Sequence, residues 1–326
     1  MTKTAEGRKK AEAAPDIPAP AAVAVGTSSY RQKYLFAFAS QPQVAQYLRT
    51  QLATEHLADI PQLMADWQAA QPLVQQLLQT EQGSADNRPI TALPEGVAEA
   101  AERLVDNDLL KRSFQLPMGI GIVDIDTLIA GQRTVNLEYV EEISNRCPRD
   151  LDIPALVEIC LSPTRIMAPI QHLELGPNVH VFSSPSTDLR FLGAFMKKLT
   201  DDDLKYATMG GIPAIAIISF IGYGASPVNV LTDGSRIVLS NGFHRVYALR
   251  HRGVRQIPVL VQVARNVQLE FPPLVAGLPR EYVLGHPRPV MMKDFFDEAL
   301  VTEVRVKQRL RSIMFQAQAG QHDVPS

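Results

Sequence analysis

The segment Val238–Leu249, with the sequence VLSNGFHRVYAL, restricts the possible folds of this chain more than any other stretch. Asp233-Gly234, just ahead of it, predicts a hairpin turn between two strands, because glycine accepts positive φ. Gly242 then turns the chain into a predicted helix over about 243–252, and Gly253 suits the position after a helix end. A buried strand is expected next, so the segment predicts a strand, a glycine turn, a helix and a strand in close succession.

The start of this predicted helix is suited to an anion. The first turn of a helix has free backbone N–H groups and the positive end of the helix dipole, which together stabilise a negative group. Gly242 has no Cβ, so a phosphate could approach the backbone closely. His244 and Arg245 add two potential cations in the first turn, where cations are unfavourable unless a negative ligand arrives. The alternative is that Arg245 pairs with a nearby carboxylate and that His244 packs in the core.

Composition limits the classes of protein to which the chain can belong. Its 326 residues carry a net charge of -2, whereas DNA-binding domains are usually strongly basic. Cys147 and Cys160 lack the spacing of a zinc site, so reduced thiols and no metal site are expected. The longest apolar run, 212–221, is too short for a membrane span of about 20 residues. Because an Ala/Pro tract replaces the apolar part of an export signal, a cytoplasmic location without a membrane partner is expected.

Hydrophobic periodicity divides the chain into four expected segments. Residues 1–29 are rich in Ala, Pro, Lys and Glu and are expected to be disordered. Residues 30–114 have apolar residues at helical spacing and are expected to form a helical region. Residues 115–265 are expected to form an α+β domain with an insertion at about 150–222, and residues 266–326 a helical tail.

Two further helices are predicted from apolar spacing. The stretch Asp188–Tyr206, inside the insertion, is predicted to be helical because several of its apolar residues would share one helix face. The tail is predicted to contain an amphipathic helix surrounded by basic residues. Its apolar face would hold Val306, Leu310, Ile313 and Met314.

The residues Gly242, His244, Arg245, Ala248 and Leu249 form the pattern G-x-H-R-x-x-A-L, which resembles the signature of the ParB/sulfiredoxin superfamily. The D-G hairpin before the pattern and the Ile-Pro-Val strand after it resemble the family's context. The earlier stretch 123–136 resembles the family's opening, in which a polar Gln/Arg segment, here Gln132 and Arg133, lies near the ligand. The resemblance covers residues 119–263 and implies a small mixed sheet with helices.

Within this superfamily the motif is implied to bind nucleotide phosphates: CTP in ParB proteins, ATP in sulfiredoxins, and a phosphoryl donor in some free-serine kinases. Sulfiredoxins have a catalytic cysteine where this chain has Phe243, so sulfinic-acid reduction is not expected. The kinases have an aspartate where this chain has Asn241, which cannot act as a general base or hold magnesium as a carboxylate would. No helix-turn-helix of the partition proteins is found after Val263.

The motif and the resemblance lead to a hypothesis of a nucleotide-binding module whose ligand, CTP or ATP with or without Mg²⁺, switches assembly or DNA association. DNA, a protein partner and a homo-oligomer are left open as partners. One alternative is an ATP-dependent phosphotransferase acting on a small molecule, which would need a carboxylate such as Asp124, Asp126 or Asp233. Another is an interaction scaffold that has lost its ligand. The predicted binding residues are Gln132, Arg133, Asn241, Gly242, Phe243, His244 and Arg245.

Overall fold

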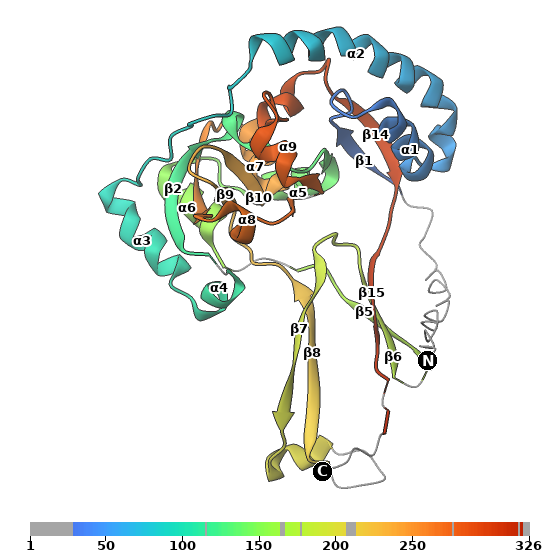
Figure 1. Cartoon of the computed structure of the whole chain (residues 1–326), viewed down its shortest axis with the longest axis vertical. Helices are drawn as coiled ribbons and strands as arrows, with labels where there is room; N and C mark the ends of the chain where they lie inside the picture. Colours follow the sequence, from blue (N-terminus) through green and yellow to red (C-terminus); the bar gives the residue numbers. More distant parts are fainter. Residues whose placement is uncertain are drawn as a thin grey trace, which may run out of the picture.

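The structure is a computed structural model that describes residues 29–114, 116–163, 167–176, 178–206, 213–275, 277–318 and 320–321. Within these residues the chain is a mixed α+β protein with several small sheets, which confirms the predicted class at that level (Figure 1). The segment expected to be disordered, residues 1–29, lies outside the described residues except for Ser29. No helix in the described ranges has the length and apolar character needed to cross a membrane.

A five-stranded mixed sheet forms the centre of the molecule. Its strands, in spatial order, are β2 (Met118–Asp124), β11 (Gln256–Val263), β9 (Asn229–Thr232), β10 (Ile237–Asn241) and β3 (Ile129–Ala130). The β9–β10 pair is the predicted antiparallel hairpin, and Gly234 in its turn has a φ of 92°. The pairs β11–β9 and β10–β3 are parallel, so β3 and β10 end at the same edge of the sheet.

Three helices pack near this sheet: α5 (Leu137–Arg146), α6 (Ile153–Leu161) and α7 (Phe243–His251). Each begins where the sequence provides a start signal. The side chains of Asn136 and Asp152 accept N-cap hydrogen bonds at the starts of α5 and α6. The predicted glycine turn precedes α7, and Gly253 follows it with a φ of 89°, as its place after the helix end requires.

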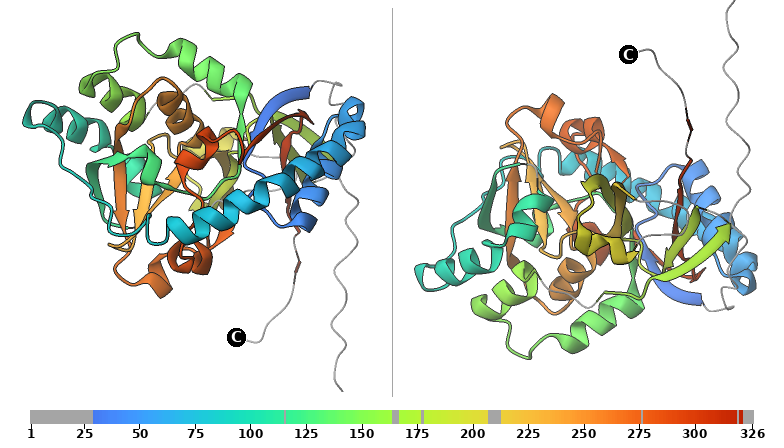
Figure 2. Two further views of the ribbon diagram at one scale, coloured as in Figure 1. Left: turned by 90° about the horizontal axis from the view of Figure 1, so that it is seen from above. Right: turned by 90° about the horizontal axis from the view of Figure 1, so that it is seen from below.

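The region expected to be helical before the sheet contains α1 (Gln41–Gln51), α2 (Ile60–Thr80), α3 (Glu95–Val105) and α4 (Asp108–Ser113), with the 3-10 helix η1 (Thr54–Asp59) between α1 and α2. Helix α2 runs along the end of the molecule opposite the projecting hairpins, and the left view of Figure 2 looks down onto it. The prediction is wrong at its beginning. There β1 (Ser29–Tyr34) pairs with β14 (Thr302–Lys307) and β4 (Thr134–Asn136), a distant pairing that local spacing could not indicate.

The expected helical tail is wrong. Its described residues form the short helices α8 (Val267–Glu270), α9 (Arg280–Gly285) and η4 (Met292–Phe296), together with β12 (Leu274–Val275), β13 (Leu278–Pro279), β14 and β15 (Arg311–Gln316). In β14 the buried Val304 and Val306 alternate with exposed Arg305 and Lys307. That period of two belongs to a strand with one buried face.

After α6, the rest of the insertion forms two hairpins that project from the core (Figure 1). In one, β5 (Gln171–Gly176) and β6 (Val179–Ser184) form a three-stranded sheet with β15. In the other, β7 (Leu189–Lys198) pairs with β8 (Ile215–Tyr223), and the 3-10 helix η3 (Asp201–Tyr206) follows β7. The predicted helix over Asp188–Tyr206 is therefore wrong for β7, because pairing with β8 fixes it as a strand.

One hydrophobic core joins the segments that the sequence separated. Leu35 and Leu48 from the first region, Val123 and Leu239 from the sheet, and Phe295 from the tail belong to one buried cluster. Segments that come before and after the central sheet in the sequence therefore pack with it in one core. The corner that precedes α7 lies within this larger body.

Candidate anion site at the start of helix α7

Gly242 is the N-cap residue of α7 and has a φ of 97°, in the left-handed region that disfavours other residues. No side chain caps this helix start. A Cβ at Gly242 would lie 2.8 Å from Cγ2 of Val228. The left-handed backbone conformation and the close approach of Val228 therefore explain why a glycine occupies this position. A bound phosphate is not needed to explain it.

Arg245 is fixed by backbone carbonyls. Its guanidinium donates to the carbonyl oxygen of Ile159 at 3.0 Å and to that of Ser226. Ile159 lies in the last turn of α6, where carbonyl groups have no partner inside the helix, so Arg245 satisfies part of the end of α6. Both of these partners are neutral carbonyl groups.

His244 is a neutral hydrogen-bonding group. Its Nε2 accepts from the backbone N–H of Asn136 at 3.1 Å, and its ring packs edge-on against Tyr139. Burial lowers the pKa of His244 to about 4, so the imidazole is uncharged at neutral pH. Because Nε2 accepts, the proton of the neutral ring is on Nδ1. His244 is therefore a neutral donor, in contrast to the predicted second cation.

Asn241 holds the loop 224–228, which connects β8 to β9, against the same corner. Its Nδ2 donates to the carbonyl oxygens of Ala225 at 2.8 Å and of Pro227 at 3.1 Å. Together with the bond from Arg245 to Ser226, the two motif side chains bind three consecutive carbonyl groups. Oxygen atoms of the chain itself thus accept from the side-chain donors that were predicted to meet a phosphate. Phe243, the remaining motif residue, is buried in the core.

Gln132 and Arg133 lie at the same sheet edge as the motif, because they follow β3 and β3 runs parallel to β10. Gln132 donates to the carbonyl of Thr134, and Arg133 Nη1 lies 3.4 Å from Oε1 of Gln43. In the described parts of the chain, Nε of Arg133 is buried without a hydrogen-bond partner, and no hydrogen bond joins either residue to 241–245. The structure brings them to the edge but not into contact with the motif.

Sequence reasoning did not identify the contacts of the loop that closes the corner. Ser226 is only 4% exposed, and its Oγ has no partner among the described residues, although its carbonyl accepts from Arg245. The only sequence signal for this loop was the turn composition of Gly224-Ala-Ser-Pro227 between two apolar stretches. That signal predicts a turn but does not indicate what the turn contacts.

The carboxylates considered for a phosphotransferase are engaged by other groups. Asp124 accepts from the backbone N–H of Asp126 at 2.9 Å. Asp126 pairs with Arg250 at 2.6 Å and with Arg255. Asp233 accepts the backbone N–H groups of Ser235 and Arg236 inside the hairpin turn. Each therefore has a structural role that accounts for its position.

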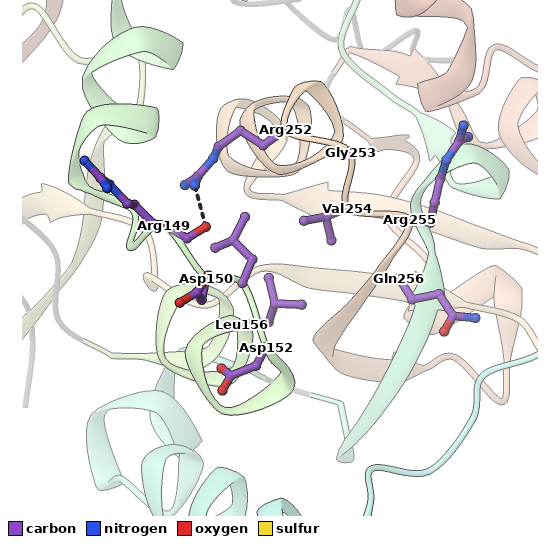
Figure 3. Close-up of a pocket in the computed structure, with 10 residues that line it drawn as sticks. Arg149, Asp150, Asp152, Leu156, Arg252, Gly253, Val254, Arg255 and Gln256 are labelled. Carbon is purple, nitrogen blue, oxygen red and sulfur yellow. Dashed lines mark hydrogen bonds between the residues drawn. The ribbon is translucent and has the colours of Figure 1, made fainter.

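A cavity of about 610 Å³ opens at the other end of α7 (Figure 3). Arg252 bends towards the carbonyl of Arg149, while the side chains of Arg149 and Arg255 point away from the opening. None of the seven predicted site residues lines this cavity. Its arginines do not converge on a common point (Figure 3).

Comparisons with protein-family models, with curated proteins and with solved structures found no match to this chain. The resemblance to the ParB/sulfiredoxin superfamily therefore rests on the sequence pattern within residues 119–263. Within that range the chain does form the hairpin, the glycine turn, the helix and the strand that the pattern predicts.

Proposed function

We propose that this chain is a nucleotide-responsive module of the ParB/sulfiredoxin type, which binds the phosphates of CTP or ATP at the start of α7. The observation that carries the proposal is a helix that begins at a left-handed glycine, without a side-chain cap, directly after β10. Such a helix start offers backbone N–H groups and a positive dipole end to an anion.

The proposed donors are the backbone N–H groups of Phe243 and His244, Nδ1–H of His244 and the guanidinium of Arg245. A neutral imidazole can donate to a phosphate without the repulsion that a second cation would meet at the positive end of a helix. The phosphate would thus be bound by oriented dipoles and one full positive charge. That arrangement differs from the pair of cations expected from the sequence.

The side chains of Asn241 and Arg245 donate to carbonyl groups of the loop, where phosphate oxygens would be expected. These carbonyl groups belong to Ala225, Ser226 and Pro227. Phosphate binding would exchange these carbonyl oxygens for phosphate oxygens and release the loop 224–228 from Asn241 and Arg245. Because this loop joins β8 to β9, its release would change how the β7–β8 hairpin is held. This exchange gives a physical basis for a switch of assembly.

Among the alternatives, an interaction scaffold is favoured by the exposed apolar residues of the β7–β8 hairpin. The phosphotransferase is not favoured, since Asp124, Asp126 and Asp233 are each held by other groups. For DNA association, the net charge of -2 offers no support. We therefore propose assembly as the property that the nucleotide controls.

Calorimetric titration of ATP and CTP, with and without Mg²⁺, tests the proposal in wild type and in Asn241→Asp. The substituted carboxylate keeps the shape of the side chain but adds a negative charge at the corner, so affinity should fall about tenfold or more, which is about 1.4 kcal/mol. Arg149→Ala is the matched control, because it removes an exposed charge away from the corner and should leave binding unchanged. Equal affinity in wild type and Asn241→Asp, or no binding by wild type, would contradict the proposal.

A further inference from the structure

Two histidines face each other across the β5–β6 hairpin, which projects from the core together with β15 (Figure 1). Nε2 of His172 lies 3.1 Å from Nδ1 of His180. The two residues are 8 positions apart in the sequence, which is not a usual spacing of zinc ligands. Only the pairing of β5 with β6 brings the two rings together, so the local sequence gave no sign of this contact.

The strand register places a carboxylate on the same face of the sheet. Glu174 lies directly opposite His180, and it is two residues from His172 on β5. Directly opposed residues share a face, and so do alternate residues of one strand, so all three side chains lie on one face. Glu174 is exposed, and within the described part of the chain its carboxylate has no hydrogen bond or ion pair.

Aromatic packing restricts the orientation of one imidazole. Phe182 lies directly opposite His172, and the two rings stack with centroids 4.8 Å apart and an interplanar angle of 19°. This contact limits rotation of the His172 ring while Nε2 stays beside His180. The two nitrogens are therefore held near each other before any ligand arrives, which lowers the entropic cost of binding one.

The distance between the two nitrogens suits two ligands of one metal ion. Zn²⁺ binds histidine nitrogen at about 2.0–2.1 Å in tetrahedral geometry, so two such nitrogens lie roughly 3.3 Å apart. In a pair of neutral rings, one of the facing nitrogens must donate a hydrogen bond and the other accept it. A metal ion would instead take the lone pair of both nitrogens, and each ring would carry its proton on its other nitrogen.

We propose that His172 Nε2, His180 Nδ1 and the carboxylate of Glu174 bind a divalent transition-metal ion of the Zn²⁺ type, with water as the fourth ligand. No group of three such side chains is already arranged for a metal ion among the described residues, so the Glu174 side chain must rotate towards the two histidines. Imidazole nitrogens suit Zn²⁺, whereas Mg²⁺ and Ca²⁺ prefer oxygen ligands.

Such an ion would tie an edge strand to its neighbour. β5 is at the edge of its sheet, and its residues from Gln171 to Leu175 are all exposed, so it buries almost no apolar surface. Hydrogen bonds to β6 and the stack of His172 on Phe182 are its contacts across the hairpin. Ligands from both strands would add a cross-strand bond at a place where packing contributes little. None of the residues of the proposed nucleotide site takes part.

Calorimetric titration of Zn²⁺ into the full chain, without a purification tag or nucleotide, tests the proposal. Wild type should bind one more Zn²⁺ than the double variant His172→Gln with His180→Gln, or bind it at least tenfold more tightly. The double variant keeps every other histidine and both cysteines, so the difference isolates this site. His251→Gln, which removes an exposed histidine of α7, should bind as wild type does, and Mg²⁺ should not replace Zn²⁺. Equal Zn²⁺ binding by wild type and the double variant would overturn the proposal.

Nuclear magnetic resonance of the imidazole nitrogens tests whether one ion is shared. The signals of His172 and His180 should shift together and stop shifting at one equivalent of Zn²⁺. A shift confined to one of the two rings would overturn the shared site. Glu174→Gln should bind Zn²⁺ severalfold more weakly than wild type, because the amide has no negative charge, and unchanged affinity would overturn the assignment of this carboxylate.

Discussion

His244 and Arg245 are adjacent at the start of α7, where the positive end of the helix dipole repels a cation. The two residues avoid this repulsion in different ways. His244 is uncharged, because burial lowers its pKa to about 4. Arg245 stays charged, and its guanidinium donates hydrogen bonds to the carbonyl groups of Ile159 and Ser226. The helix dipole is therefore opposed by one cation, and that cation is bound to the negative ends of other peptide dipoles.

The depressed pKa of His244 predicts a loss of stability in mild acid. Below its ordinary pKa of 6.5 the unfolded chain binds a proton at this position, whereas the folded chain does not do so until about pH 4. The free energy of unfolding should therefore fall as the pH decreases from about 6.5 to 4, by up to about 3 kcal/mol from this group. Urea unfolding at pH 7 and pH 5 measures the effect.

The control for this prediction is His251→Gln, because His251 is exposed at the other end of α7. His244→Gln retains a side-chain oxygen that can accept from Asn136 N–H and should lose most of the pH dependence. His251→Gln should retain it. An unchanged pH slope in His244→Gln would mean that another group dominates the acid sensitivity.

At the scale of elements, a buried ion cluster connects the end of α2 to the C-terminal region. Arg288 is fully buried, donates to both carboxylate oxygens of Asp294 at 2.6 Å, and reaches Glu81 at 2.9 Å. Glu81 is the C-cap residue of α2, while Asp294 lies in η4. The cluster therefore fixes the long helix against a segment more than 200 residues later in the sequence.

Replacing Arg288 by Met should destabilise the protein by about 3–5 kcal/mol, because Asp294 would remain buried without its partner. Lys293→Ala, which removes a more exposed partner of Glu81, should cost less than about 1 kcal/mol. Chemical unfolding of the three proteins gives the comparison. The double variant Arg288→Met with Asp294→Leu should recover part of the loss, and a double variant no more stable than Arg288→Met would argue against a charge effect.

The elements that sequence reasoning predicted are those whose signals are local. The turn Asp233-Gly234, the glycines around α7 and the N-cap Asn136 each act within a few residues. β7 was mistaken for a helix because a β-bulge between Phe191 and Gly193 shifts the strand's alternation by one residue. That shift places apolar residues at a spacing that resembles one face of a helix.

In the candidate site, too, local features were predictable from the sequence and distant contacts were not. Local sequence located the strand, the glycine and the two basic residues, but it could not supply their partners. Arg245 bonds to Ile159, 86 residues away, and His244 accepts from Asn136, 108 residues away. The electrostatic state of the site is set by these distant contacts, which is why the local pattern predicted two cations where the structure has one.

At the scale of the whole molecule, the loop 224–228 is the only direct chain connection from the β7–β8 hairpin to β9, and Asn241 and Arg245 bind it. A nucleotide that displaces this loop would act on that hairpin, whose exposed apolar residues favour assembly. Two sites that influence each other through one element must do so reciprocally: if nucleotide strengthens or weakens assembly, assembly strengthens or weakens nucleotide binding in the same direction.

This coupling predicts that CTP or ATP binds with different affinity to wild type and to the variant Met196→Ser with Ile217→Ser, which reduces the exposed apolar surface of the hairpin. A change of about fivefold or more is expected, since coupling free energies between sites commonly reach at least that size. Calorimetric titration measures both affinities, and sedimentation of wild type with and without nucleotide measures the reverse effect on self-association. If self-association and nucleotide binding both occur but neither changes the other, the two sites are independent, and the carbonyl groups of the loop are not the element through which a nucleotide controls assembly.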